Sequence, residues 1–389
     1  MTSDKDIGIM TAQEFLGTGL LKDRIIAGPC NEHYVRIEEK EFESAVTHLA
    51  TNKFVLISLF CCEGFTANAV QTLFYVFERR TSILVLVRGV NDQATSIADL
   101  YPVASWFERE CRDGFGVEFA GAFDARRLFL HETYPEGFHP LKKAFKNAPI
   151  VTRKTVDPVE EYPFREVSGE GVYQVPVGPV HAGIIEPGHF RFSVIGETIF
   201  NLECRMFYKH RGIEKLAEGK SPQECVRIAE AVSGDESVAN ATAFCMAIEK
   251  ISQVPVPVRA WYLRTILMEL ERLCSHLGDQ AGMLVDVAYP LGASQFSVLR
   301  EECFRENDRL TGSRFLRGMV YPGGVNRDIS KMQLDELAAF VHHMRNRYKV
   351  WLKIMLTTAS VIDRFATTGV ICPALLRPLV VGRIYVSRE

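Results

Sequence analysis

The part of the chain best suited to chemistry is residues 178–192, which read Gly-Pro-Val-His-Ala-Gly-Ile-Ile-Glu-Pro-Gly-His-Phe-Arg-Phe. Four titratable or charged side chains (His181, Glu186, His189 and Arg191) stand here among three glycines and two prolines. Such a loop can bring backbone close to a ligand and direct imidazoles and a carboxylate into a cleft. A turn whose polar groups bond only to one another has the same composition, so both interpretations stay open.

Other sequence signatures of catalysis are absent. The ten cysteines include no Cys-x-x-Cys pair, the spacing at which two thiolates converge on zinc, an iron–sulfur cluster or a redox centre. The chain also has no Gly-x-Gly-x-x-Gly, His-Glu-x-x-His or Gly-x-Ser-x-Gly motif. These absences argue against a Rossmann dehydrogenase, a zinc hydrolase and a serine esterase, and we expect no metal ligand set in this chain.

Composition and charge narrow the class of protein further. The chain has 389 residues, 47% of them hydrophobic and 24% charged, as in ordinary globular proteins with two or three domains. Its 45 Lys plus Arg against 48 Asp plus Glu provide no basic field, so no nucleic-acid partner is expected. No apolar run approaches the roughly 18–20 residues that cross a bilayer, so membrane contact would come through partner subunits.

An α/β module is expected to form the first part of the chain. Residues 54–60 are a short apolar run that predicts a buried strand. Two β-rich runs, 73–77 and 83–87, predict a hairpin. A stretch with three prolines and mixed charges then looks like a linker. The predicted organisation is a first domain at 1–147, a linker at 148–170 and a second domain at 171–389.

The second domain begins with strands and continues as helices, so the predicted fold class is α+β. Alternating apolar residues over 190–206 predict a β-hairpin, and Ser221-Pro-Gln-Glu224 is a capping box at the start of a helix. A leucine stripe of 3.6-residue period predicts a helix over 258–277, and another helical pattern covers 329–366. The expected architecture is a hairpin followed by a mainly helical bundle.

Four segments of this domain resemble motifs shared by the 49 kDa-type (D-type) subunit of NADH-quinone oxidoreductase (complex I) and the large subunit of group 4, energy-converting NiFe hydrogenases. They are residues 178–192, residues 207–215 (Phe-Tyr-Lys-His-Arg-Gly-Ile-Glu-Lys), residues 264–276 (Arg-Thr-Ile-Leu-Met-Glu-Leu-Glu-Arg-Leu-Cys-Ser-His), and Gly323-Gly-Val with Asp328. In the first domain, residues 106–141 resemble the 30 kDa-type (C-type) subunit of the same complex. A C-like module ahead of a D-like one is the arrangement in formate-hydrogenlyase-type large subunits.

The resemblance implies a 30 kDa-type, C-like module at 1–147 and a 49 kDa-type, D-like domain at 171–389. Residues 106–141 would then be an assembly surface rather than a catalytic one. The last ten residues, Val380–Glu389, do not continue the family pattern. We therefore expect that the reading frame is truncated or shifted around residue 380.

The resemblance also implies which cofactors to expect. In the hydrogenases a Cys-x-x-Cys supplies thiolates to nickel, but Ser233 and Glu236 stand at those positions here, so nickel is not expected. The 49 kDa-type protein of complex I instead lines a quinone cavity, with a headgroup histidine in the loop before the hairpin. His189, or else His181, matches that histidine. The family's second quinone contact, a tyrosine, aligns with Gly234.

We therefore expect a cavity in which reduction is coupled to proton movement. The predicted catalytic residues are Glu186, His189, Arg191, Asp235 and Glu236. The residues predicted to contact a cofactor are His181, His189, Ser233, Gly234, Arg264, Arg272 and His276. For Arg264, Glu269, Arg272 and His276, an ion-paired spine along the bundle is favoured over a direct proton role.

The function that the resemblance implies is that of a peripheral subunit of a membrane-bound oxidoreductase, on the cytoplasmic side of the inner membrane. Electrons would arrive from an iron–sulfur cluster in a B-like small subunit, and H-like and antiporter-like subunits would form the membrane arm. Quinone is the candidate ligand. Two alternatives stay open: a catalytically silent scaffold, and a NiFe hydrogenase large subunit, which the missing thiolates argue against.

Overall fold

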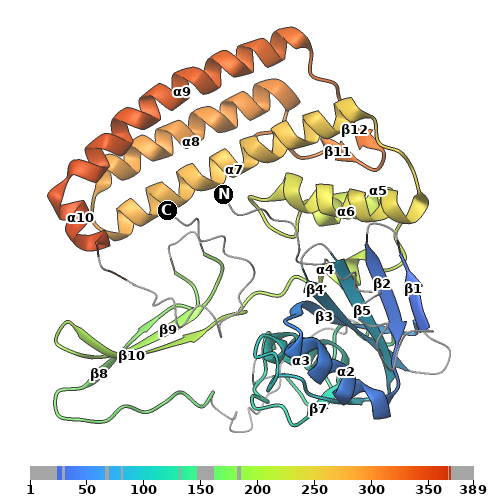
Figure 1. The fold of residues 1–389 in the computed structure, drawn as a ribbon. Coiled ribbons are helices and arrows are strands. Elements are labelled where there is room, and N and C mark those ends of the chain that lie inside the picture. The colour runs from blue at the N-terminus through green and yellow to red at the C-terminus, as the bar shows by residue number, and fades with distance from the viewer. Residues whose placement is uncertain are drawn as a thin grey trace, which may run out of the picture. The chain divides into compact units, whose positions relative to one another are not determined.

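The computed structural model describes residues 24–28, 31–65, 70–79, 82–130, 132, 134–146, 162–181, 185–366 and 368. The chain divides into two compact units, the first made of Met1–His181, Pro187–His210 and Ile371–Glu389, and the second of Ala182–Glu186 and Arg211–Val370. The first combines sheets with short helices and the second is mainly helical (Figure 1), which confirms the predicted α+β class. The domain limits at 1–147, 148–170 and 171–389 stay a prediction.

A five-stranded sheet is the centre of the first unit. Its strand order is β1-β2-β5-β4-β3, and all neighbours are antiparallel except β2 and β5. The elements are β1 (Ile25–Ala27), β2 (Glu32–Arg36), α2 (Glu39–Thr51), β3 (Val55–Glu63), β4 (Gln71–Arg79), β5 (Ser82–Val90), β6 (Gln93–Thr95), α3 (Ala104–Phe115) and β7 (Glu118–Ala120). The predicted strand at 54–60 and the predicted hairpin are confirmed, although the hairpin ladder continues to Arg79 opposite Ser82.

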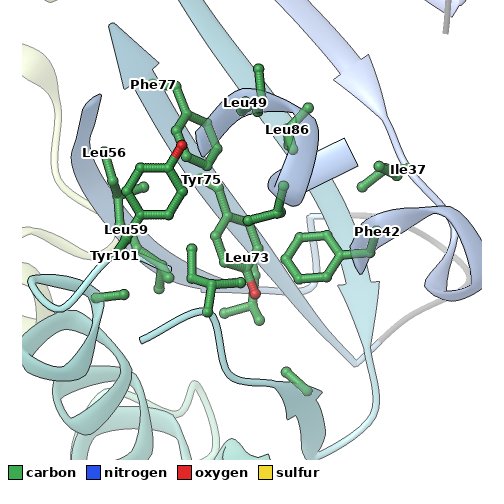
Figure 2. Packing of buried hydrophobic residues seen from close by; sticks show 14 of the residues in the cluster. Ile37, Phe42, Leu49, Leu56, Leu59, Leu73, Tyr75, Phe77, Leu86 and Tyr101 are labelled. Atoms are coloured by element: carbon green, nitrogen blue, oxygen red, sulfur yellow. The ribbon is translucent and has the colours of Figure 1, made fainter. Parts of the chain in front are cut away.

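Helix α2 covers one face of this sheet because its apolar residues recur on one side. Phe42, Val46 and Leu49 are spaced i, i+4 and i+7 and are each at most 1% exposed. They belong to one cluster with Leu73 and Tyr75, which alternate along β4 (Figure 2). The ring centroids of Phe42 and Tyr75 lie 4.9 Å apart. The α/β part of the first unit therefore has a hydrophobic core of its own.

A three-stranded antiparallel sheet follows, in the order β10-β9-β8. Its strands are β8 (Tyr173–Val177), β9 (His189–Ile195) and β10 (Thr198–Arg205), so the predicted hairpin is confirmed and β8 is an addition to it. The register puts apolar side chains on one face: Tyr173, Val175, Val177, Phe190, Phe192, Val194, Ile199, Leu202 and Cys204. The opposite face is polar and carries His189 and Arg191, which lie opposite Arg205 and Glu203 of β10.

The second unit is a helical bundle in which α7, α8 and α9 lie side by side (Figure 1). Its elements are α4 (Ile213–Ala217), α5 (Pro222–Ala229), α6 (Ser237–Ser252), α7 (Val258–Asp286), α8 (Pro290–Thr311), β11 (Val320–Tyr321), β12 (Gly324–Val325), α9 (Lys331–Thr357) and α10 (Ala359–Phe365). The predicted leucine stripe of α7 is buried, with Leu263, Leu267 and Leu277 each at most 2% exposed. This stripe forms the centre of the bundle core.

The predicted helix limits are correct at some ends and wrong at others. Ser221 forms the predicted capping box, accepting from the Glu224 N–H, and α5 begins after it. Helix α7 continues past the predicted end to Asp286, and the predicted helix over 329–366 is two helices separated at Thr358, whose backbone is extended. Within the described part of the chain, no helix combines the length and apolarity that crossing a bilayer requires.

Candidate functional site

Close backbone contacts between Gly178, Pro179 and Gly188 lie directly before His189, the first residue of β9. Gly178 lies in the left-handed region at φ +81°, and a Cβ added there would lie only 2.2 Å from the Gly188 carbonyl oxygen. The Gly188 N–H donates to the Pro179 carbonyl at 3.1 Å, so the two ends of the loop meet. Glycine is required at position 178 because any side chain would force these two backbone segments apart.

The hydrogen bond of His189 fixes which ring nitrogen is free. Its Nδ1 lies 3.2 Å from the Gly178 carbonyl oxygen, which can only accept, so Nδ1 carries the proton of the neutral ring. Nε2 is then a lone-pair acceptor, and it is buried with no hydrogen-bond partner among the described residues. The buried Nε of Arg191 and Nε2 of His181 likewise lack a partner within the described ranges.

The unpartnered nitrogens of His189 and Arg191 lie on one face of the three-stranded sheet. His189 and Arg191 are two residues apart on one strand, so their side chains share the polar face of the sheet. Leaving a buried polar group unsatisfied costs about 1–3 kcal/mol, which is why such groups mark sites that receive a water or a ligand. One acceptor and one donor on the same face would suit a ligand that offers both a hydroxyl and a carbonyl oxygen.

An aromatic ring that sequence reasoning missed lies against both side chains. The Phe164 ring centroid is 5.2 Å from that of His189, and the Arg191 guanidinium lies 4.4 Å from the same Phe164 centroid. The second distance is typical of a cation–π contact. Phe164 belongs to the segment predicted as a linker, where no sequence signal distinguished it from the residues around it.

The other half of the predicted site lies in the second unit, on residues 231–236. Ser233 Oγ donates to Asp235 Oδ1 at 2.8 Å, and Asp235 and Glu236 are exposed. Arg211 joins Glu186 to this segment: its Nη2 lies 2.5 Å from Glu186 Oε1, while its Nη1 donates to the Val232 carbonyl. Arg211 thus links Glu186 to the backbone of segment 231–236. That His189 and Arg191 face them across one cavity stays a prediction.

Two further residues that the sequence did not single out hold this segment in place. Arg317 donates from Nη2 to the Gly234 carbonyl at 3.3 Å and from Nε to Ser237 Oγ at 3.2 Å. Glu271 accepts from the N–H groups of Val238 and Ala239 at 2.6 and 2.9 Å, at the start of α6. Both contacts join residues far apart in the chain, so no local sequence pattern marks them.

Burial changes the protonation of Glu271. Desolvation raises the pKa of its carboxyl above the usual value, and although the two N–H groups act in the opposite direction, the charges of Glu236 and Asp235 add to the rise. Burial likewise raises the pKa of Glu230, whose Oε1 accepts from the Gly318 N–H at 2.6 Å. Segment 231–236 is therefore bordered by two carboxyls that hold protons at higher pH than exposed ones do.

We expect the free energy of unfolding of the Glu271→Gln variant to increase, relative to that of the wild-type protein, as pH rises. A carboxyl with a raised folded-state pKa favours folding while it is protonated, so its contribution is present below the ordinary pKa of 4.5 and declines above it. Glutamine stays neutral, so urea unfolding should show the stability difference moving towards the variant between about pH 4 and pH 7. Glu269→Gln, on the exposed side of the same helix, is the control, and the expectation fails if Glu271→Gln shows no such trend.

The four polar residues of α7 do not form one ion-paired spine, which corrects the favoured interpretation. Arg264 is fully buried and pairs with Glu249 on α6 at 2.6 Å. Arg272 instead forms an exposed pair with Glu269 at 2.5 Å, and His276 lies 3.9 Å from its neighbour Asp279. The reason is helical geometry: position 264 falls on the buried stripe, whereas positions 269, 272 and 276 face outward. Cofactor contacts by Arg264, Arg272 and His276 stay predictions.

Part of the predicted assembly surface is occupied by the chain itself. The Trp106 ring lies 5.5 Å from that of Phe207, and the His210 ring stacks on Phe129 at 4.1 Å. Phe207 and His210 directly follow β10, so the C-like module and the hairpin of the D-like region contact one another within the first unit. Residues 106–141 therefore have at least one intrachain role.

Ser233 and Glu236, which the resemblance puts at the nickel positions of the hydrogenases, offer no thiolate to a metal. Position 233 offers a hydroxyl that is already bonded to Asp235, and position 236 offers a carboxylate. Bridging between metals in a soft, sulfur-rich site needs thiolates, which neither side chain can supply. In the described ranges, no group of three or more His, Cys, Asp or Glu side chains is arranged to hold a metal ion.

Comparison with known proteins identifies the family of both parts of the chain. Residues 35–150 match the family described as "Respiratory-chain NADH dehydrogenase, 30 Kd subunit", and residues 293–376 match "Respiratory-chain NADH dehydrogenase, 49 Kd subunit". The chain belongs to this family as a fusion of the two types. The resemblance expected from the sequence is thereby confirmed in both halves of the chain.

The relatives of this C/D-type chain include hydrogenase subunits as well as complex I subunits. It is 35% identical to hydrogenase-4 component G of Escherichia coli, over 76% of this chain and 54% of the relative. It is 33% identical to formate hydrogenlyase subunit 5 of Escherichia coli, over 80% and 56%. It is 28% identical to the C/D subunit of the NADH-quinone oxidoreductase of Phocaeicola vulgatus, over 75% and 59%. The chain spans about half the length of these curated relatives.

Proposed function

We propose that this chain is a peripheral subunit of a membrane-bound, multisubunit oxidoreductase, and that the polar face around His189 and Arg191 binds a quinone-type headgroup. The observation that carries the proposal is the pair of buried, unpartnered nitrogens on that face, the Nε2 of His189 and the Nε of Arg191. The names of the relatives support the first part, since each is a subunit or component of a larger assembly.

The two side chains would act differently on a quinone ring. The Arg191 Nε–H can donate to a carbonyl oxygen and would stabilise the negative charge that develops there on reduction. Neutral His189 has its proton on Nδ1, so its Nε2 can accept a hydrogen bond from a quinol hydroxyl, and the protonated ring can return that proton to a reduced carbonyl oxygen. The proposed role of this face is to couple electron arrival to proton transfer.

The chain depends on partners for electrons. We propose that a B-like small subunit brings an iron–sulfur cluster near this face, and that H-like and antiporter-like subunits attach the assembly to the cytoplasmic side of the inner membrane. That Glu186, Asp235 and Glu236 take part in proton transfer is also part of the proposal, since carboxylates can accept and donate protons.

The test is made on the purified complex that contains this chain. Elemental analysis should find less than one nickel per complex, the complex should evolve no dihydrogen, and it should reduce a short-chain ubiquinone. Stoichiometric nickel with dihydrogen evolution would contradict the proposal in favour of a NiFe hydrogenase. Absence of both activities, with the complex intact, would support a silent scaffold instead.

A further inference from the structure

We propose that residues 162–165 are a strap that positions His189 and Arg191, and that the C-like module sets the place of this strap. The inference rests on the proposed function, which gives the two side chains their importance. The contacts of the strap with them are the same whether or not a quinone binds there. All of the contacts involved lie within the first unit.

The strap crosses the polar face of the three-stranded sheet. Phe164 lies against both His189 and Arg191, as described above. One residue later the Arg165 backbone N–H donates to Glu203 Oε2 at 2.8 Å, and Glu203 lies opposite Arg191 in the strand ladder. Contacts on two neighbouring strands therefore fix the Phe164 ring over the site.

Tyr162 fastens the other end of the strap. Its ring lies 4.6 Å from Phe164 and packs against the Arg205 guanidinium at 4.2 Å. Arg205 is only 9% exposed and lies opposite His189 in the ladder. Phe164 of the strap thus contacts His189 directly, and Tyr162 contacts Arg205, the residue opposite His189 in the strand ladder.

Both contacts that hold Tyr162 in place, with Arg126 and with Arg205, depend on residues of the C-like module. Arg126 donates to the Tyr162 hydroxyl at 2.7 Å and is itself held by Asp124 at 2.8 Å. Glu132 pairs with Arg205 at 2.5 Å. The Arg205–Glu132 pair is largely buried, and the exposed Arg126 is held by both Asp124 and Tyr162. Charged contacts with several members hold geometry better than single exposed ion pairs do.

The strap determines how much water reaches one nitrogen of the site, the Nε2 of His189. Phe164 covers the imidazole, so the Nε2 of His189 is kept from bulk water while it stays free of partners among the described residues. A desolvated acceptor interacts more strongly with a ligand hydroxyl than a hydrated one does. Fusion of the two modules in one chain has a physical function here, because the first module holds the strap over the second module's histidine.

The test measures access to His189 rather than enzyme activity. The intact complex is treated with diethyl pyrocarbonate, which modifies accessible neutral imidazoles, and the rate at each histidine is read by mass spectrometry. Phe164→Ala should increase the rate at His189 several-fold relative to that at His342, which is exposed on α9 and serves as the internal reference. Arg126→Met, which releases Tyr162, should give a smaller increase in the same direction.

Two further variants separate the strap from a general loss of structure. Phe164→Trp keeps an aromatic cover and should leave His189 protected, whereas Phe123→Ala removes an exposed ring elsewhere in the first unit and should change nothing. An unchanged rate at His189 in Phe164→Ala would overturn the strap. Because the reagent needs no quinone, this outcome is distinct from failure of quinone binding, which would leave the proposed strap intact but without its ligand.

Discussion

Replacement of Arg264 by methionine is expected to destabilise the helical unit by about 3–5 kcal/mol. Arg264 is 0% exposed and Glu249 is 6% exposed, so the substitution leaves a buried carboxylate without its partner. The guanidinium also donates to the carbonyls of Tyr321 and Gly324, which would lose their donor as well. Urea unfolding followed by the helical signal would measure the loss, since the helices lie mainly in this unit.

The controls for Arg264 come from its own helix and its partner. Arg272→Met removes an exposed pair with Glu269 and should cost less than about 1 kcal/mol. The double variant Arg264→Met, Glu249→Gln should be more stable than Arg264→Met alone, because no unpaired charge is then buried. A loss in Arg264→Met as small as that in Arg272→Met would contradict the structural role assigned to the pair.

The same pair predicts a loss of stability in acid. Burial alone would raise the pKa of Glu249, but the hydrogen bonds from Arg264 and the Gly323 N–H outweigh it and lower the pKa below 4.5. A carboxyl with a lowered folded-state pKa stabilises the fold above its ordinary pKa, and this contribution is lost as pH falls through the folded-state value. The difference between wild type and Arg264→Met should therefore shrink below about pH 4.5.

Replacement of His189 by glutamine is expected to lower quinone reduction by the complex about tenfold or more. The substitution removes the imidazole that exchanges a proton with the ligand, and hydrogen bonds that involve charged groups contribute about 1.5–3 kcal/mol. Glutamine keeps a polar side chain on the same strand, so the sheet should stay folded. The measurement is the initial rate of short-chain ubiquinone reduction by the purified complex.

Two other histidines test whether the effect is specific. His342 is exposed on α9, and His342→Gln should leave the rate unchanged. His181, the second choice for the headgroup histidine, also has a buried Nε2 without a partner among the described residues, so His181→Gln is the matching test of that residue. A full rate in His189→Gln together with a large loss in His181→Gln would move the headgroup contact to His181.

The fold was predictable wherever local patterning and tertiary packing agree. The hairpin of β4 and β5 and the capped start of α5 were correct because β-rich runs and the Ser221 capping box depend on neighbouring residues only. Strand β8 was missed because Pro176 lies within a five-residue strand, and proline argues against strand structure. The end of α7 was predicted too early, at residue 277. The next residue, Gly278, continues the helix and packs closely against α8, since a Cβ there would approach the Arg300 guanidinium to 2.8 Å.

The candidate site was predictable only in its local part. Loop 178–192 stood out by composition, and within the described ranges its His181, His189 and Arg191 carry buried nitrogens without a partner. The residues that hold the site could not be found in the same way. Arg317 and Glu271 contact residues 234–239, and Phe164 contacts His189, all through segments distant in the chain, and nothing in their immediate sequence sets them apart.

Photolabelling of the intact complex with an azido-quinone, followed by peptide mapping of this chain, tests most directly whether a quinone binds at His189 and Arg191. We predict that the label falls on residues 178–192 or on Phe164, that excess ubiquinone prevents it, and that His189→Gln reduces it strongly. Label confined to other segments, or label on 178–192 that excess ubiquinone fails to displace, would contradict a quinone site at His189 and Arg191.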